Sequence, residues 1–481
     1  MQQQPSFSTP KSDLDRLTIF TFLWAVVRFF HQISFPEWYY EREWEGVLVM
    51  LVLVLCLVRP QSLTLLIALL TTSLVRTFIW MPFNPNHILF EWVVDAAILI
   101  CILFAIVQNR NRKNELAFRN DLFDSFAPIA RISICILYFF GVFHKLNTDY
   151  LKIPISCGAV LLQEIADRMY PMAVGDVPKL IAMWGTLIIE SLIPVLLIGT
   201  KTRKWGILLG LVFHFMLSFH PHRGIYSFSS LMLGYFSLFL PQNAPLLLKE
   251  SYLSFKARYM LLPGWQRWLI GLGIPTGFVA YLGYMRMHVT NGYENVMQIG
   301  FVLWCAWAIV TLLVYILVFI PAKWEFTPSF FKLPSRWAIM VFLLLLLNGL
   351  SPYLGFKTQT SFSMFSNLRT EGGKTNHLLM PNAIVTHQWQ DDLVQITRTD
   401  APNLCDFADG RRMLTYFELH RLASVNQQDF FVEYKQGNQS KKLIVKNGVS
   451  SDPELTTPLS LLNYKFIRFR PVFKDTCYCQ H

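Results

Sequence analysis

A histidine and a lysine stand at the end of a long apolar run, in the stretch ILYFFGVFHKLNTDYL at residues 136–151. His144 and Lys145 follow hydrophobic side chains, and Asn147 and Asp149 come soon after. Burying an ammonium group in hydrocarbon costs at least ~2.5 kcal/mol, so Lys145 needs a physical reason to be there. Either its side chain snorkels to the membrane surface as an anchor, or desolvation favours the neutral amine, which can act as a base.

Two other apolar segments carry polar side chains toward the same depth. WMPFNPNHILFEW contains Asn86 and His87, with Arg76 about one turn earlier, and KWGILLGLVFHFMLSFH contains His214. Taken alone, His87 is an interfacial hydrogen-bonding residue and His214 a core histidine. Convergence of polar groups from three spans favours a shared site. We predict catalytic roles for Lys145, His87 and His214, and ligand-binding roles for Asn86, His144, Arg76 and Asn147.

Further charged residues have two interpretations each. Glu91, Asp95 and Glu190 lie deeper in their spans, where they either balance Arg76 or His214 or bond between helices, and the second is slightly favoured. The stretch SMFSNLRTEGGKTNHLLMP carries an arginine, a glutamate and a Gly-Gly pair. It either lies over the membrane site and binds an acidic group, or forms an ordinary strand and turn, which we favour.

The composition requires helices that position these residues in a bilayer. Of the 481 residues, 53% are hydrophobic and 15% charged, whereas soluble proteins average about 25% charged. A run of about 20 apolar residues crosses a ~30 Å hydrocarbon core, and about ten or eleven runs can be placed. They cover residues 17–34, 46–58, 62–81, 88–108, 127–146, 177–199, 204–219, 225–241, 268–286, 297–320 and 337–355. The second is short enough to be re-entrant.

The basic charge is distributed unevenly among the loops. A net charge of +11 is compatible with nucleic-acid binding. With a cytoplasmic N-terminus, however, about 17 Lys and Arg residues fall in loops on that side and about 6 on the other, so the charge reflects topology and predicts no nucleic-acid partner. Residues 1–16 are polar and partly acidic, unlike a signal or transit peptide, and form a cytoplasmic tail. We predict a multi-pass protein of a bacterial inner membrane or a eukaryotic endomembrane.

The last third of the chain has a different pattern. FFVEY at 430–434 and KKLIV at 441–445 flank QGNQS, which predicts a β-hairpin, and RRMLTYFELHRLA at 411–423 has the spacing of an amphipathic helix. The predicted fold is therefore a polytopic α-helical membrane protein. It has a membrane domain at 17–355 and a small exoplasmic α+β domain at 356–481. LLQEIADRMY at 161–170 is expected to form a short interfacial helix.

The eight cysteines fall into two groups. Cys56, Cys101, Cys135 and Cys305 lie within apolar runs and are typical packing residues. The terminal CYCQH lacks the four-ligand spacing of a structural zinc site, so no metal is predicted. A disulfide from Cys405 or Cys157 to one of the two terminal cysteines is compatible with an exoplasmic location, and sequence leaves the pairing open.

Four motifs, in order along residues 15–390, resemble one known family. FFGVFHKLNTDYL resembles the lysine-containing segment of the vitamin K-dependent gamma-glutamyl carboxylases and of their bacterial relatives with the horizontally transferred transmembrane (HTTM) domain. NPNHILFE resembles the Asn-His loop of that family, and FHFMLSFHPHRGIYSFSSLMLGYFSLFLP resembles its Phe-His segment. SPYLGFKTQTSFSMFSNLRTEGG resembles the start of the family's exoplasmic domain.

The resemblance implies a reaction. In those carboxylases a lysine deprotonates vitamin K hydroquinone, and the oxygenated vitamin removes a proton from a glutamate, whose carbanion captures carbon dioxide. The resemblance assigns the base to Lys145, the Asn-His pair to Asn86 and His87, and the Phe-His histidine to His214. It implies a reduced vitamin K or other lipid quinol as cofactor and oxygen and carbon dioxide as co-substrates. The implied enzyme class is a lyase or quinol monooxygenase, and the implied partners are membrane lipid, the quinone and an exoplasmic protein or peptide acceptor.

Two departures bear on the acceptor. His144 stands where the animal enzymes have a second lysine, and the tail is much shorter than their propeptide-binding region. We therefore expect a different acceptor. The alternative is a membrane component without catalysis, either a transporter or a lipid- or quinone-binding protein, in which the same polar cluster binds a ligand. Replacement of Lys145 by arginine separates the two, because arginine keeps the charge but supplies no neutral amine.

Overall fold

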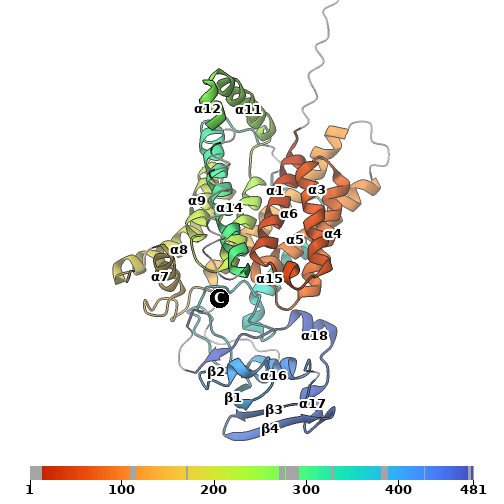
Figure 1. Ribbon diagram of the computed structural model, residues 1–481, viewed down its shortest axis with the longest axis vertical. Helices are drawn as coiled ribbons and strands as arrows, with labels where there is room; N and C mark the ends of the chain where they lie inside the picture. The colour runs from red at the N-terminus through yellow and green to blue at the C-terminus, as the bar shows by residue number, and fades with distance from the viewer. Residues whose placement is uncertain are drawn as a thin grey trace, which may run out of the picture.

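The structure is a computed structural model, mostly helical, with a small antiparallel sheet near the C-terminus (Figure 1). It describes residues 14–108, 115–169, 172–269, 273, 277, 292–326, 330–380, 388–426, 428–474 and 478–479. The helical body comes first in the chain. Its helices are α1 (Arg16–Ser34), α2 (Glu37–Tyr40), α3 (Trp44–Val58), α4 (Leu63–Trp80), α5 (Asn86–Gln108), α6 (Glu115–Phe143), α7 (Cys157–Met169), α8 (Asp176–Ile198), α9 (Arg203–Leu217), α10 (Arg223–Ser237), α11 (Ala244–Leu261), α12 (Gly264–Trp268), α14 (Gly292–Val314) with the π-helix η2 (Tyr315–Phe319), and α15 (Ala338–Leu354).

Six of the described helices are long and apolar enough to cross a membrane. They are α1, α4, α5, α6, α8 and the segment Gln298–Phe319. α3 and α15 are apolar but have only 15 and 17 residues. A helix of 15 residues is about 22 Å long, less than the ~30 Å of hydrocarbon. The described residues therefore support a multi-pass membrane protein with fewer full-length spans than the ten or eleven expected, and much of the run at 268–286 lies outside them.

Local signals in the sequence set several helix ends. The side chain of Asp15 accepts a hydrogen bond of 2.7 Å from the backbone N–H of Thr18 and so caps α1. Ser62 caps α4 in the same way, through the N–H of Leu65. Gly355, with φ of +81°, adopts the left-handed conformation that ends α15.

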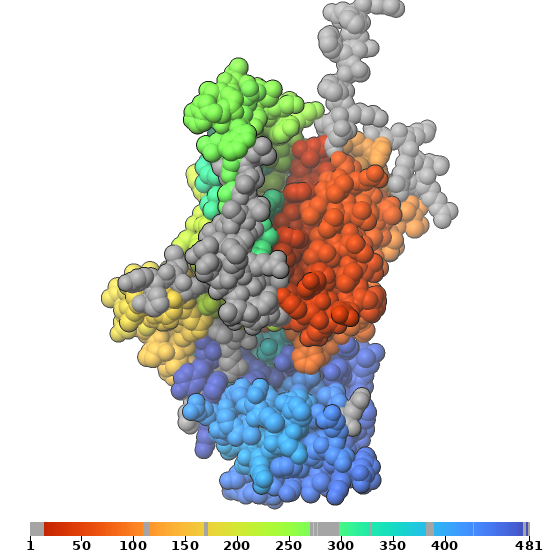
Figure 2. Space-filling model, in the orientation of Figure 1, coloured from red at the N-terminus to blue at the C-terminus, as the bar shows by residue number. Residues whose placement is uncertain are grey.

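The ends of the helical body differ in what they contact. The first turn of α1 meets the N-terminal part of α6 at one end, where the Arg16 guanidinium binds Asp124 at 2.7 Å. Helices α11 and α12 lie at that same end (Figure 1). The C-terminal domain lies at the opposite end, as a lobe below the helices in Figure 2. There Lys465 Nζ donates to the carbonyl of Ile79 at 2.6 Å. The start of α1 and the C-terminal domain thus lie at opposite ends of the helical body, as the predicted topology requires. That the end with the start of α1 is cytoplasmic stays a prediction.

The C-terminal domain is built on a sheet of six strands in the order β5-β4-β3-β1-β2-β6. The strands are β1 (Leu393–Thr399), β2 (Arg412–Thr415), β3 (Phe430–Gln436), β4 (Gln439–Lys446), β5 (Val449–Ser450) and β6 (Val472–Phe473), and the helices are α16 (Tyr416–Ala423), α17 (Pro453–Thr456) and α18 (Leu461–Phe466). β3 and β4 form the predicted hairpin, in which Gly437 supplies a φ of +56°.

The prediction of one helix over 411–423 is wrong in its first part. Residues 412–415 form β2, which pairs with β1 and with β6, and only 416–423 form α16. The Thr415 hydroxyl accepts from the N–H of Glu418 and so fixes the helix start. A pattern of apolar spacing alone could not show that two other strands pair with these four residues.

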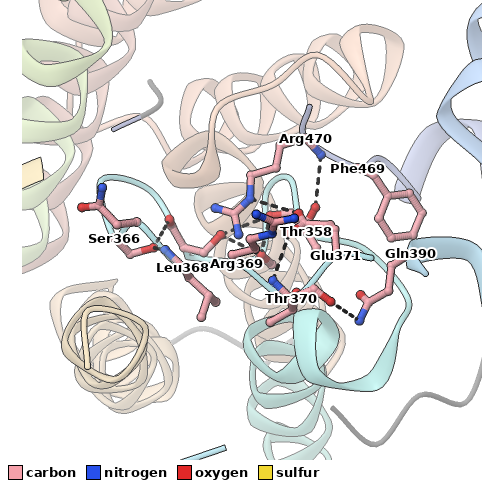
Figure 3. A network of polar contacts seen from close by, with 12 residues as sticks. Thr358, Ser366, Leu368, Arg369, Thr370, Glu371, Gln390, Phe469 and Arg470 are labelled. Carbon is pink, nitrogen blue, oxygen red and sulfur yellow. Dashed lines mark hydrogen bonds and ion pairs between the residues drawn. The ribbon is translucent and has the colours of Figure 1, made fainter. Parts of the chain in front are cut away.

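The segment between α15 and β1 forms neither a described helix nor a described strand as far as residue 380. Its residue His377 makes one isolated bridge with Asn147. A polar network attaches this segment to the last strand (Figure 3): Arg470 Nε lies 3.1 Å from Glu371 Oε1, and an Arg369 amino group donates to the carbonyl of Phe473 at 3.2 Å. These contacts agree with a structural role for Arg369 and Glu371. The strand predicted for the stretch around them, however, is wrong.

A disulfide joins Cys157, the first residue of α7, to Cys479 across 322 residues of sequence. This is one of the pairings that sequence left open, and Cys405 remains a free thiol. α7 contains the predicted interfacial helix but begins four residues before it. The bridge attaches the end of the chain to a helix that forms one wall of a cavity of about 540 Å³.

Candidate functional site

A cavity of about 540 Å³ lies among α6, α7, α8, α9, α10 and the segment after α15. Most of its walls are apolar, with Leu161 and Leu162 from α7 and Phe228 and Met232 from α10. Its polar lining residues are Asn86, His87, Tyr138, Lys145, Tyr150, Thr186, Glu190 and His214. The structure therefore brings together four of the seven predicted residues, two from α5, one from α9 and one just after the end of α6.

Lys145 lies two residues beyond the end of α6, and its side chain is only 6% exposed. Its Nζ lies 2.5 Å from Glu190 Oε2 of α8 and donates to the carbonyl of Gly141 at 3.1 Å. A buried ion pair of this length excludes the surface-anchor interpretation and also replaces the lone neutral amine that we expected. Sequence indicated that Glu190 lies deep in a span, but not that its partner is Lys145.

His214 on α9 is buried, and its Nε2 lies 2.9 Å from the hydroxyl of Tyr138 on α6. Its Nδ1 has no hydrogen-bond partner among the described residues. Tyr138 thus fixes the orientation of the ring, and His214 lines the cavity. Sequence reasoning missed Tyr138, although it precedes Lys145 by two helical turns and so shares its face of α6.

His87 and Asn86 lie in the first turn of α5 and make different contacts. His87 Nε2 is 3.0 Å from the hydroxyl of Ser227 on α10. The side-chain oxygen of Asn86 accepts a hydrogen bond of 2.7 Å from the N–H of Phe362. Asn86 therefore positions the segment after α15 against the cavity, while His87 connects α5 to α10.

Comparison with protein families identifies part of the chain. Residues 93–243 match the HTTM domain family. The chain contains an HTTM domain. This is the domain of vitamin K-dependent carboxylase-related proteins. No match was found among curated proteins or among solved structures.

The HTTM domain contains most of the polar lining of the cavity. Tyr138, Lys145, Glu190 and His214 all fall within residues 93–243. Asn86 and His87 precede the matched region by a few residues. The cavity is thus formed chiefly by the HTTM domain and closed by residues on either side of it in sequence.

Two predicted ligand-binding residues beside Lys145 lie outside the cavity lining. His144 Nδ1 is 2.9 Å from the hydroxyl of Tyr353, and its Nε2 is 3.2 Å from the carbonyl of Ser361. The amide of Asn147 donates to the carbonyls of His144 and Ser366, at 2.8 and 2.6 Å. Consecutive residues at a helix end point in different directions, so only Lys145 faces the cavity.

Arg76, the third predicted ligand-binding residue that does not line the cavity, lies in another part of the helical body. Its guanidinium is 3.2 Å from Glu43 and stacks on the ring of Trp80. It lines a separate cavity of about 280 Å³. The sequence predicted that Arg76 lies at the depth of this site, but α4 does not border the cavity of the HTTM domain.

The segment at 360–367 closes the cavity with an unusual backbone. Thr360, Phe362, Phe365 and Asn367 all have positive φ, between +53° and +63°. Residues other than glycine rarely adopt this conformation, so the surroundings must hold it. Asn86 and the backbone N–H of Cys157, which donates to Asn367 Oδ1 at 2.7 Å, are two such contacts. Phe362, Phe365 and the intervening Met364 line the cavity.

A second buried lysine follows α15. Lys357 is 7% exposed, and its Nζ is 3.4 Å from the Thr360 hydroxyl. Burial lowers the pKa of Lys357 to about 7. A lysine pKa lowered by burial, which the sequence suggested for Lys145, is therefore found at Lys357. Lys357 does not line the cavity. Sequence reasoning missed it because one lysine after an apolar span resembles an ordinary interfacial anchor.

Proposed function

We propose that the protein is a membrane enzyme that binds a lipid quinol in the cavity of the HTTM domain and uses it, with oxygen, to drive proton abstraction and carboxylation of an acceptor. The observation that carries the proposal is the buried pair of Lys145 and Glu190, 2.5 Å apart in an apolar cavity. Such pairs of titratable groups in a concave site are frequent at sites of acid-base chemistry.

The residues fit a quinol in size and in chemistry. A volume of about 540 Å³ lies within the range of ligand cavities, roughly 300–1,000 Å³. The apolar walls suit a ring and an isoprenoid chain, and Lys145 and His214 offer polar contacts to a hydroxyl. When bound, a quinol would supply the electrons that reduce oxygen and the strong base that the acceptor requires.

The Lys145–Glu190 pair accepts the proton in this proposal. In an apolar site an ion pair and its neutral form, amine with carboxylic acid, are closer in free energy than in water. When the Nζ proton moves to Glu190 Oε2, the Lys145 amine becomes free to take a proton from a ligand hydroxyl. Glu190 is thus the reservoir that allows a normally charged lysine to act as a base.

The two histidines and Tyr138 orient the ligand. Tyr138 holds His214 Nε2 at 2.9 Å and so fixes the orientation of a ring that lines the cavity. His87, held at 3.0 Å from Ser227, borders the same cavity from α5. We infer that these neutral donors and acceptors bind the oxygens of the quinol head.

The proposed location places the C-terminal domain on the exoplasmic side of the membrane and residues 1–16 in the cytoplasm. The Cys157–Cys479 disulfide supports this orientation, because structural disulfides persist mainly in oxidising compartments. The acceptor is then an exoplasmic protein or peptide. No metal has a role in the proposal.

The test uses the purified full chain in lipid nanodiscs with reduced vitamin K or menaquinol and oxygen. We expect quinone epoxide and, with labelled bicarbonate and candidate acceptors, labelled product. Lys145→Ala and Glu190→Gln should lower the rate by roughly 10²–10⁴-fold, the usual contribution of general base catalysis. Lys152→Ala is the matched control, because it removes an exposed lysine that also has a carboxylate partner, Asp149, but lies outside the cavity. Wild-type protein that leaves every quinol unchanged would contradict the proposal.

The second candidate is a binding or transport protein without catalysis. The observation that favours it is that Lys145 already has a carboxylate partner at 2.5 Å, as in many structural ion pairs. Epoxide formation separates the candidates, because wild-type protein should form epoxide only if it is the enzyme. Lys145→Arg should then abolish epoxide formation while it retains binding of radiolabelled menaquinone, whereas a binding protein should form no epoxide in either form.

A further inference from the structure

A cluster of charged side chains lies beside the cavity of the HTTM domain, between α1 and α5. The Arg28 guanidinium is 3.0 Å from Glu91 Oε2 and also contacts the carboxylate of Asp95. The three side chains are 6%, 0% and 1% exposed. Trp24 Nε1 donates to Asp95 Oδ1 at 2.9 Å. The cluster resolves the open alternatives for Glu91 and Asp95 in favour of contacts between helices, with Arg28 as the partner that sequence reasoning missed.

The charges of this cluster do not cancel. One guanidinium faces two carboxylates, so the fully ionised cluster carries a net charge of −1. An uncompensated charge buried in a medium of low dielectric constant costs several kcal/mol. Glu91 Oε1 has no hydrogen-bond partner among the described residues, as expected for an oxygen that carries a proton or contacts a water. One additional proton makes the cluster neutral.

Other charged and titratable side chains lie close to this cluster. His31 Nδ1 lies 3.2 Å from Glu91 Oε2, so the imidazole is one place where the proton can reside. Arg76 pairs with Glu43 and also interacts electrostatically with the buried Glu45, and Arg223 pairs with Glu37. Both arginines line the smaller cavity. The other titratable groups nearby are Tyr235, which interacts electrostatically with Glu91 and Asp95, and His222, which interacts with His87.

The cavity of about 280 Å³ gives this cluster access to water. Arg28 and His31 line it, together with Gln32 and Ser73. The side-chain oxygens of Gln32 and Ser73 have no hydrogen-bond partners among the described residues, although these residues are only 4% and 3% exposed. Buried polar atoms of this kind are normally satisfied by water, and the volume holds several water molecules.

A histidine pair connects the cluster to the cavity of the HTTM domain. The rings of His31 and His87 are 5.6 Å apart, centroid to centroid. His87 lines the larger cavity, and His31 lines the smaller one. Imidazole is a common proton shuttle, and we take these adjacent rings as the route between the cluster and the cavity.

We propose that Arg28, His31, Glu91 and Asp95 form a proton-binding site that holds one exchangeable proton and transfers protons between His87 and the hydrated smaller cavity. In the reaction this site releases the proton that Lys145 and Glu190 take from the ligand, and that role rests on the proposed function. The binding of one proton does not depend on it.

The test is infrared spectroscopy of the full chain in nanodiscs at neutral pH, with selective labelling of histidine for nitrogen NMR. We expect either a carboxylic acid band that disappears in Glu91→Gln or in Asp95→Asn, or an imidazolium at His31. Glu43→Gln is the matched control, because it removes a carboxylate of a neutral pair at the same cavity and should leave these signals intact. Absence of both signals in wild-type protein would overturn the proposal.

Stability and exchange provide further readouts. Glu91→Gln leaves one guanidinium with one carboxylate, so it should fold and lose the exchangeable proton, whereas Arg28→Gln leaves two carboxylates and should be destabilised. His31→Phe should slow deuterium exchange of the acid band, and unchanged exchange would overturn the route through His31. If the acid band is present but no quinol reacts, the proton site stands and the proposed function fails. If quinol is turned over but neither proton signal is found, the proposed function stands and the proton site fails.

Discussion

Lys357 offers the sharpest quantitative prediction. Burial lowers its pKa from the ordinary value of 10.5 to about 7. At 1.36 kcal/mol per pH unit, holding this lysine charged in the folded protein costs roughly 5 kcal/mol relative to the unfolded chain. Because the folded pKa is the lower one, the unfolded chain binds more protons between about pH 7 and 10.5, and stability rises with pH over that window. The destabilisation is complete below pH 7 and disappears above about pH 10.5.

The perturbation is Lys357→Met, which keeps the length of the apolar stem and removes the ammonium group. It loses one hydrogen bond of 3.4 Å to the Thr360 hydroxyl, worth about 1 kcal/mol at most. We therefore expect a net gain of up to about 4 kcal/mol at pH 6.5, about half of it at pH 8.5, and none at pH 10.5.

The measurement is thermal unfolding in nanodiscs across this pH range. Lys446→Met, at an exposed position of β4, is the control and should change stability little at any pH. A gain that is the same at every pH, or a loss of stability at neutral pH, would refute the assignment of the cost to a buried charge.

Three further predictions concern the helical body. Removing one member of the Lys145–Glu190 pair should destabilise the protein by about 3–5 kcal/mol, and replacing both by Met and Leu should restore most of that stability, as measured by unfolding of the single and double variants. Cys157→Ser should lower stability by about 2–4 kcal/mol and leave one more titratable thiol than wild-type protein under denaturing, non-reducing conditions, whereas one thiol fewer would rule out the disulfide. Gly349→Ala places a Cβ 2.3 Å from a ring of α6 and should cost about 1–3 kcal/mol, while Gly185→Ala, with no atom within 4 Å of the new Cβ, should cost nothing.

The sequence by itself determined the features that depend on neighbours along the chain. Apolar runs gave the positions of most helices, and the alternation around QGNQS gave the hairpin of β3 and β4. The depth of Asn86, His87, Lys145 and His214 followed from their places within those runs. That these four line one cavity was a correct inference about position, and their roles in chemistry stay predictions.

Only the tertiary structure decided which side chains meet. Lys145 contacts Glu190 across 45 residues, and His214 contacts Tyr138 across 76. Such contacts depend on which helices adjoin and how each is rotated about its axis, and hydrophobic periodicity fixes the apolar face of a helix but not its neighbour. For the same reason the sequence could not show that Arg28 contacts Glu91 and Asp95. Nor could it show that Lys357 is buried, which distinguishes it from a surface lysine.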